Sequence, residues 1–225
     1  MAVRGATANY TGDETVAGAG TEDAPALKLF SAPWSPPAWM KRPFTPGGVP
    51  SMDVSAPNCL VPDARAAWAL YFSLWHTAMQ QQASGIGIPF WGFSVQNEPL
   101  AHGHMWDCCG YTLGNYTEFI KDYLVPVMQK DHPALKLLLF DHNPDNVEKW
   151  AGTSLNDSLI GEYAWGTAVH WYSDPVHRGA QLNATHLAHP AKPILHTEGC
   201  VCRDMYVLCV ACSVHPCLGS LAVSV

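Results

Sequence analysis

Five short apolar runs in this chain each end in a cluster of polar or aromatic residues, and this arrangement limits the folds that the sequence can adopt. The runs have the length and the aliphatic or aromatic composition of β-strands. Segments with a helical spacing of apolar residues separate most of them, and this alternation is typical of an α/β fold with a parallel sheet. The clusters are Ala32-Pro33-Trp34, Gln96-Asn97-Glu98-Pro99, Asp141-His142-Asn143-Pro144, His170-Trp171-Tyr172-Ser173-Asp174-Pro175 and His196-Thr197-Glu198.

Two of the clusters place a glutamate directly after a strand-length run. A βα unit of an eight-fold barrel averages about 31 residues, so three units span about 95. Glu98 and Glu198 are 100 residues apart, and we therefore expect them to face each other across the mouth of a (β/α)8 TIM barrel. Two carboxyl groups in that position are what a glycosidase needs: one protonates the leaving oxygen, and the other attacks or activates water.

The segments between the runs predict helices and two long loops. Asp63 is expected to cap a helix over residues 64–82, because apolar residues recur there at helical spacing. A second helix is expected from Asn115 or Thr117 to about Asp131, with a kink or an early stop at Pro126. The other expected elements are a short helix around 145–151, a helix near 178–188, and loops over 41–62 and 101–114.

Composition and charge narrow the class of protein. The 225-residue chain is 48% hydrophobic and 14% charged, which indicates one domain with a sizeable core. A complete barrel takes about 250 residues, so the chain is slightly short for one. The net charge of -7 argues against a nucleic-acid partner, because phosphate binding requires a basic face. No apolar run reaches the roughly 18 residues of a membrane span.

Cysteine and histidine patterns offer two alternative metal sites, and both are weak. Four of the eight cysteines lie in the last 24 residues, where Cys209 and Cys212 form a lone C-x-x-C without a second pair. The histidine candidates are His102, His104, His142 and His196. His102 and His104 form an H-x-H pair that could bind zinc with a carboxylate, but the pair lies in a glycine-containing loop without fixed geometry. We therefore expect no metal and no cofactor.

Two signals on the cellular compartment conflict. The first residues contain no apolar h-region, so no signal peptide is visible. Four N-x-S/T sequons nevertheless favour a secreted or lysosomal glycoprotein. They begin at Asn9, Asn115, Asn156 and Asn183.

Four segments together resemble the glucosylceramidases (acid β-glucosidases) of glycoside hydrolase family 30. The segments are FSAPWSPPAWMK, FWGFSVQNEP, GTAVHWYSDP and ILHTEGC, and the similarity runs from about residue 27 to 201. The resemblance implies a retaining β-glucosidase that hydrolyses glucosylceramide, built on a (β/α)8 barrel with a small β-domain beside it. It also implies a glycosphingolipid substrate at a membrane surface, an activator protein, and a lysosomal or secreted location.

The resemblance also implies roles for individual residues. Glu98 matches the acid/base, and Glu198 matches the nucleophile. The residues that match positions around the bound sugar are Trp34, Asn97, His170, Trp171 and Tyr172.

The two ends of the chain depart from the family pattern. Residues 1–26 look like an irregular leader without the first two barrel strands, and residues 202–225 form an atypical Cys-rich apolar tail in place of the eighth. The expected domain, 27–201, is thus an incomplete barrel that holds the third to seventh strands. The alternative to an active β-glucosidase is an inactive truncated or splice fragment of one, with at most sugar binding.

Overall fold

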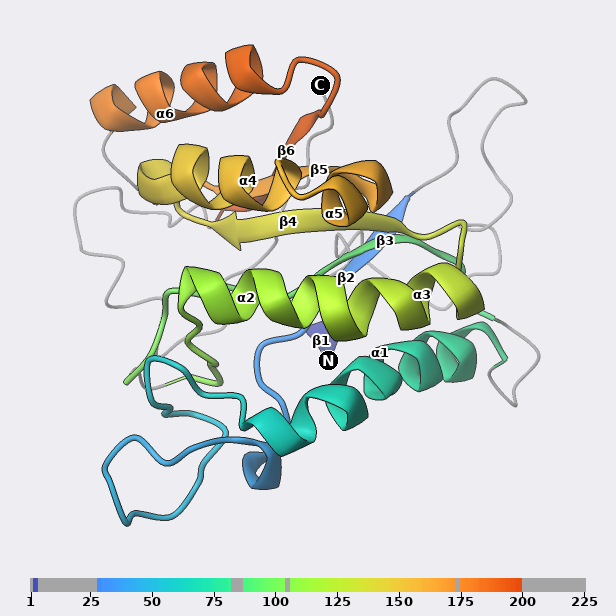
Figure 1. Ribbon diagram of the computed structural model, residues 1–225, viewed down its shortest axis with the longest axis vertical. Coiled ribbons are helices and arrows are strands. Elements are labelled where there is room, and N and C mark those ends of the chain that lie inside the picture. Colours follow the sequence, from blue (N-terminus) through green and yellow to red (C-terminus); the bar gives the residue numbers. More distant parts are fainter. Residues whose placement is uncertain (1, 4–27, 82–86, 104–105, 173–174, 200–225) are drawn as a thin grey trace, which may run out of the picture.

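The structure, a computed structural model, describes residues 2–3, 28–81, 87–103, 106–172 and 175–199 (Figure 1). Its centre is one six-stranded sheet in which the strands lie side by side in sequence order. The strands are β1 (Ala2–Val3), β2 (Leu29–Ala32), β3 (Phe90–Ser94), β4 (Lys136–His142), β5 (Ala164–His170) and β6 (Ile194–Glu198).

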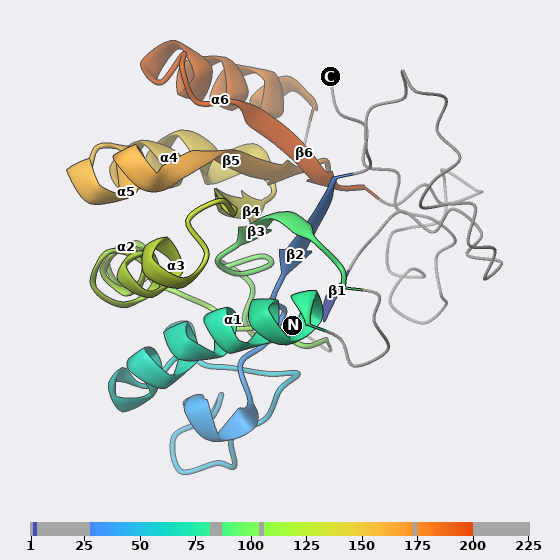
Figure 2. The same ribbon diagram turned by 90° about the vertical axis from the view of Figure 1, so that its right-hand side faces the viewer.

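The strands β2 to β6 pair in parallel, each with the next along the chain. Figure 2 shows the helices stacked along one side of this sheet, as in the outer layer of a barrel. The predicted α/β fold is confirmed, and the five parallel strands form a half-barrel, consistent with the incomplete (β/α)8 barrel expected from the sequence.

Most residues at the two ends of the chain lie outside the described residues. The first strand, β1, belongs to the segment 1–26 that we expected to be irregular, and it pairs antiparallel with β2. Residues 4–27 and the whole predicted tail, 202–225, lie outside the described residues.

The helices follow the predicted alternation and differ from it in detail. The longest are α1 (Arg65–Gln80) and α6 (Pro175–Ala188). The others are α2 (Leu113–Phe119), the π-helical turn η4 (Ile120–Leu124), α3 (Val125–Asp131), α4 (Val147–Leu155) and α5 (Ser158–Tyr163), with 3-10 turns η2 (Ala38–Met40), η3 (Pro62–Ala64) and η5 (Pro144–Asn146). No helix among the described residues is both long enough and apolar enough to cross a membrane.

Two expectations about helix ends are wrong. Asp63 does not cap α1, because it lies inside the 3-10 turn η3, and the N-cap residue Ala64 makes no side-chain hydrogen bond. Pro126 does not stop its helix, because α3 continues to Asp131, and the expected kink stays a prediction. The π-helical turn comes just before it, and Pro126 occupies the first turn of α3, where its missing N–H would need no partner within α3.

The core lies between the sheet and the helices. In β4, the side chains of Leu137, Leu138 and Leu139 are fully buried, as a central parallel strand covered on both faces requires. On α1, Phe72 lies with its ring 5.9 Å from that of Phe93 on β3. Burial of such large apolar side chains, each contributing roughly 1.5–3 kcal/mol, fixes the strand ends that carry the polar clusters.

The loops after β2 and β3 are tied together by a disulfide and a buried lysine. Cys59 forms a disulfide with Cys109, with a Cα–Cα distance of 5.4 Å. Lys41 donates from Nζ to the Ser35 hydroxyl and to the carbonyl oxygens of Met52 and Cys108. Both loops lie at the carboxyl ends of their strands, so these bonds hold one rim of the half-barrel.

Removal of the disulfide is expected to destabilise the protein. It closes a loop with a sequence separation of 50, and the chain-entropy model gives about 4 kcal/mol for a loop of that size. We expect the Cys59→Ser, Cys109→Ser double variant to unfold at a much lower urea concentration. The matched control is Cys108→Ser, which replaces the neighbouring buried free thiol. An equal loss of stability in both variants would contradict a stabilising role of the disulfide.

Candidate active site

The carboxyl ends of the parallel strands collect most of the polar residues singled out in the sequence. Glu98 lies four residues after β3, Asp141 and His142 end β4, His170 ends β5, and Glu198 ends β6. Parallel strands of one sheet place these ends at the same edge. The sequence predicted that polar residues follow the strands, but it did not predict the contacts that Asp141 makes with the other strands.

Asp141 is the buried centre of the cluster. Its Oδ1 accepts hydrogen bonds from the Thr197 hydroxyl at 2.6 Å and from Nε2 of His170 at 3.3 Å, and its Oδ2 accepts from the Ser94 hydroxyl at 2.5 Å. The side chain is almost fully buried. Burial alone would raise the pKa of Asp141, but these hydrogen bonds and the charge of His170 outweigh it and lower that pKa. Asp141 is therefore a buried carboxylate.

His170 connects this carboxylate to Glu98. Its Nδ1 lies 3.5 Å from Oε1 of Glu98, on the opposite side of the ring from Asp141. Burial lowers the pKa of His170, but the hydrogen bonds to Asp141 and Glu98, with the charges of Asp141 and Glu198, outweigh it and raise that pKa to about 10. His170 is thus an imidazolium at neutral pH, placed among three carboxyl groups.

The second histidine of the cluster, His142, behaves in the opposite way. Its Nδ1 lies 3.8 Å from Oε1 of Glu98. Burial lowers the pKa of His142 to about 4 in spite of the neighbouring acids. His142 is therefore neutral at neutral pH, and Glu98 lies between one charged and one uncharged imidazole.

The backbone around Glu98 and Asp141 adopts a left-handed conformation that non-glycine residues seldom take. The φ angles are 51° at Glu98, 75° at Phe140 and 61° at Asp141. Each such residue costs on the order of 1–3 kcal/mol and persists only where its surroundings hold it. Here the Glu98 N–H donates to the Asp141 carbonyl at 2.9 Å, and the Phe140 N–H donates to the Tyr116 hydroxyl at 2.8 Å.

Tyr172 contacts the other glutamate. Its hydroxyl donates to Oε1 of Glu198 at 3.3 Å, and its backbone N–H donates to Oδ1 of Asn143 at 3.1 Å. A phenol that donates to a carboxylate stabilises the charged form. The structure therefore brings Tyr172 and Glu198 together, and the sugar-binding role expected for Tyr172 stays a prediction.

The remaining predicted site residues lie around this edge of the sheet. Asn97 is buried, and its N–H donates to the Pro33 carbonyl at 2.8 Å. The Trp34 carbonyl accepts from Nε2 of Gln96 at 2.7 Å, which joins the ends of β2 and β3.

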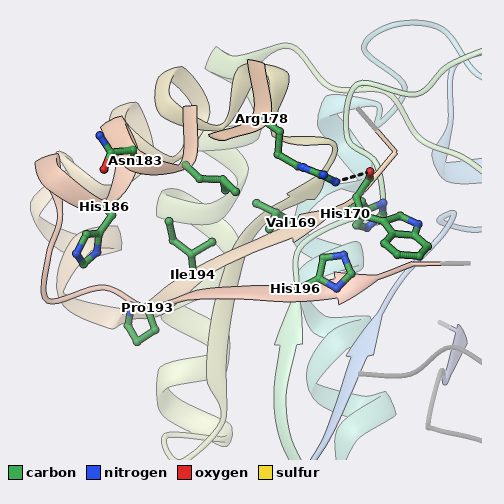
Figure 3. Close-up of a pocket in the computed structure, with 10 residues that line it drawn as sticks. Val169, His170, Arg178, Asn183, His186, Pro193, Ile194 and His196 are labelled. Atoms are coloured by element: carbon green, nitrogen blue, oxygen red, sulfur yellow. Dashed lines mark hydrogen bonds between the residues drawn. The ribbon is translucent and has the colours of Figure 1, made fainter. Parts of the chain in front are cut away.

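Trp171 lies at a pocket between α6 and the strands β5 and β6. The side chain is 38% exposed, and its carbonyl accepts from Arg178 at 2.9 Å (Figure 3). Neither Glu98 nor Glu198 lines this pocket. The pocket is lined by Val169, His170, Trp171, Arg178, Leu182, Asn183, His186, Pro193, Ile194 and His196.

Three residues of the cluster lie close enough to one another to hold a metal ion. Glu98, His142 and His170 each offer one ligand atom, and these atoms lie within 4.8 Å of one another. A metal binds a deprotonated imidazole nitrogen, so it would have to displace the proton that the neighbouring carboxylates favour on His170. The expectation that the chain binds no metal stays a prediction. Of the alternative pair predicted from sequence, His104 lies outside the described residues, and His102 is exposed.

Comparison with known proteins identifies the family. The family model "Glycosyl hydrolase family 30 TIM-barrel domain" matches residues 18–212, a range wider at both ends than 27–201. The chain belongs to glycosyl hydrolase family 30. This family consists of glycoside hydrolases. The broad prediction of a glycosidase is therefore confirmed at the level of the family.

Proteins that are similar to this chain differ in the activities that their names state. The chain is 34% identical over 181 residues to "Putative glucosylceramidase 3" of Caenorhabditis elegans, covering 77% of this chain and 32% of that protein. It is 30% identical over 179 residues to the lysosomal acid glucosylceramidase of Mus musculus, covering 78% and 33%. The solved structure of the endo-beta1,6-glucanase BT3312 superposes with a TM-score of 0.66 at 29% identity, covering 78% and 38%. The chain spans about a third of the length of these two curated relatives.

Sequence reasoning missed four residues of this family 30 site. Ser94, Asp141, His142 and Thr197 complete the cluster. His142 was considered only as a candidate metal ligand, and the other three were not proposed as site residues. One signal was present, because Asp141 ends the longest continuous apolar strand and a charged residue there needs partners. The identity of those partners follows only from the pairing of β3 to β6.

Proposed function

We propose that this chain carries the reacting groups of a retaining β-glucosidase of the glucosylceramidase type. The observation that carries the proposal is the placement of two glutamates after β3 and at the end of β6. His170 lies 3.5 Å from Glu98, and the Tyr172 hydroxyl donates to Glu198. The resemblance to proteins named glucosylceramidases supports glucosylceramide as the substrate and a lysosomal location.

In the first step, Glu198 attacks the anomeric carbon while Glu98 donates its proton to the glycosidic oxygen. The C–O bond to the aglycone breaks, the alcohol leaves as ceramide, and a glucosyl ester forms on Glu198. Tyr172 donates to Oε1 of Glu198 at 3.3 Å, which keeps the attacking carboxyl group ionised and oriented. Nδ1 of His170 lies 3.5 Å from Oε1 of Glu98, so its positive charge stabilises the negative charge that Glu98 gains as its proton leaves.

In the second step, the Glu98 carboxylate removes a proton from water, and the water oxygen attacks the same carbon. The ester bond breaks, and glucose is released with its original configuration. This two-step mechanism requires a separation of about 5–5.5 Å between the carboxyl groups of Glu98 and Glu198.

Two substrates test the proposal against the alternative that a relative's name suggests. The protein is incubated with a fluorogenic β-glucoside and, separately, with a β-1,6-linked glucan, and the anomer released is identified by proton NMR. We expect β-glucose from the glucoside. A 2-fluoro glucosyl fluoride should also leave its sugar on the peptide that contains Glu198, which mass spectrometry detects without repeated turnover. Cleavage of the glucan alone would assign this chain to the glucanases, and an inverted product would refute the mechanism.

A further inference from the structure

We propose that Asp141 is a positioning residue for this reaction, whose side chain holds His170 against Glu98 and whose carbonyl oxygen holds the backbone of Glu98. The inference rests on the proposed function, because it assigns a role within the same site. Asp141 itself contacts neither glutamate side chain in any described hydrogen bond or ion pair, so it acts through other groups.

The side chain of Asp141 links four strands at one point. Its donors come from different strands: Ser94 from β3, His170 from β5 and Thr197 from β6, while Asp141 itself belongs to β4. Two donors on Oδ1 and one on Oδ2 fix the plane of the carboxylate. That plane in turn sets the angle of the His170 ring, because Nε2 has its one bond there.

The backbone of Asp141 makes the second link. Its left-handed φ of 61° occurs in the same residue whose carbonyl oxygen accepts the Glu98 N–H at 2.9 Å. Aspartate tolerates this conformation better than most residues do. The side chain and the carbonyl of one residue therefore reach Glu98 by two routes, through His170 and through the main chain.

The charges around His170 explain why the site needs this arrangement. The groups that face its ring are Glu98 beyond β3, Asp141 and His142 on β4, Tyr172 beyond β5, and His196 and Glu198 on β6. Two reacting carboxyl groups near each other repel when both are ionised. An imidazolium held by a third carboxylate offsets that repulsion, and it stabilises Glu98 each time Glu98 becomes charged.

The test is Asp141→Asn, with Asp145→Asn as the matched control. Asparagine keeps the shape and tolerates the left-handed backbone, but it removes the charge. Asp145 is four residues further along the chain and is exposed in η5. The pKa of His170 is followed by nitrogen–proton NMR, and the pH profile of kcat/KM is measured on the fluorogenic β-glucoside.

We expect Asp141→Asn to lower the pKa of His170 by about 1–3, the size of effect that an adjacent opposite charge produces. We also expect kcat to fall roughly 10²-fold and the limb of the profile that reports deprotonation of His170 to move to lower pH. The control should change neither. A lowered kcat with an unchanged His170 titration and pH profile would reduce Asp141 to a merely structural residue and overturn the proposal.

Two further results keep the proposal testable. If Asp141→Asn fails to fold, the titration of His170 in the unmutated protein tests the proposal instead. An uncharged His170 at about pH 8 would overturn it. The histidine titration needs no turnover. A shifted His170 in a protein without β-glucosidase activity would therefore reject the proposed function and leave the link between Asp141 and His170 intact.

Discussion

Replacing Glu198 by glycine is expected to abolish hydrolysis of a β-glucoside, and added azide is expected to restore part of it. Without the carboxylate, no glucosyl ester forms, and removal of a nucleophile commonly lowers kcat by roughly 10⁴-fold or more. Azide fits the vacated space and attacks the anomeric carbon in its place. The product is then a glucosyl azide of inverted configuration, which proton NMR identifies.

Two companion variants separate this effect from damage to the fold. Glu198→Gln keeps the size of the side chain and the contact with Tyr172, and it should be as inactive as the glycine variant but insensitive to azide. Glu148→Gly changes an exposed glutamate on α4 and should keep full activity. Retention of turnover in Glu198→Gln would remove Glu198 from the mechanism.

Replacing Glu98 by alanine is expected to give an effect that depends on the leaving group. A general acid contributes typically about 10²–10⁴-fold, and a poor leaving group such as an alkyl alcohol needs that proton. A dinitrophenyl β-glucoside does not need it, so glucosylation of Glu198 should proceed at nearly its normal rate. The second step still lacks its base, and the glucosyl-enzyme should accumulate as a burst followed by slow turnover.

The control for this variant is Glu162→Ala, because Glu162 is an exposed carboxylate on α5. It should behave as the unmutated protein with both substrates. Equal losses on the alkyl and the dinitrophenyl glucosides in Glu98→Ala would show that Glu98 does not act as the proton donor.

The order and direction of the parallel strands could be predicted from the sequence because each strand carries its own apolar run and a polar end. Details that arise from local competition could not. The π-helical turn before Pro126 has no separate signal in the apolar pattern, and the short helix α5 has too few residues to show a clear period.

The site could be predicted only where a residue is informative by itself. Glu98 and Glu198 stand out because each follows an apolar run of strand length in the sequence. Asp141 owes its importance to Ser94 and Thr197, which lie 47 and 56 residues away in the chain. The Cys59–Cys109 disulfide was equally hidden, since eight cysteines allow about a hundred fully paired arrangements.

Among the described residues, β3 and β6 are covered unequally, so we expect the segments that carry the two glutamates to differ in local stability. β3, which leads to Glu98, pairs with a strand on each side, whereas β6 is the last strand of the described sheet and every residue in it is half-buried. Outer strands open by local fluctuation at a smaller free energy than inner ones, and their amide protons exchange sooner. A group that binds along β6 would therefore reduce the local opening of the segment that carries Glu198. The segment that carries Glu98 would gain less, because the core already holds β3 in place.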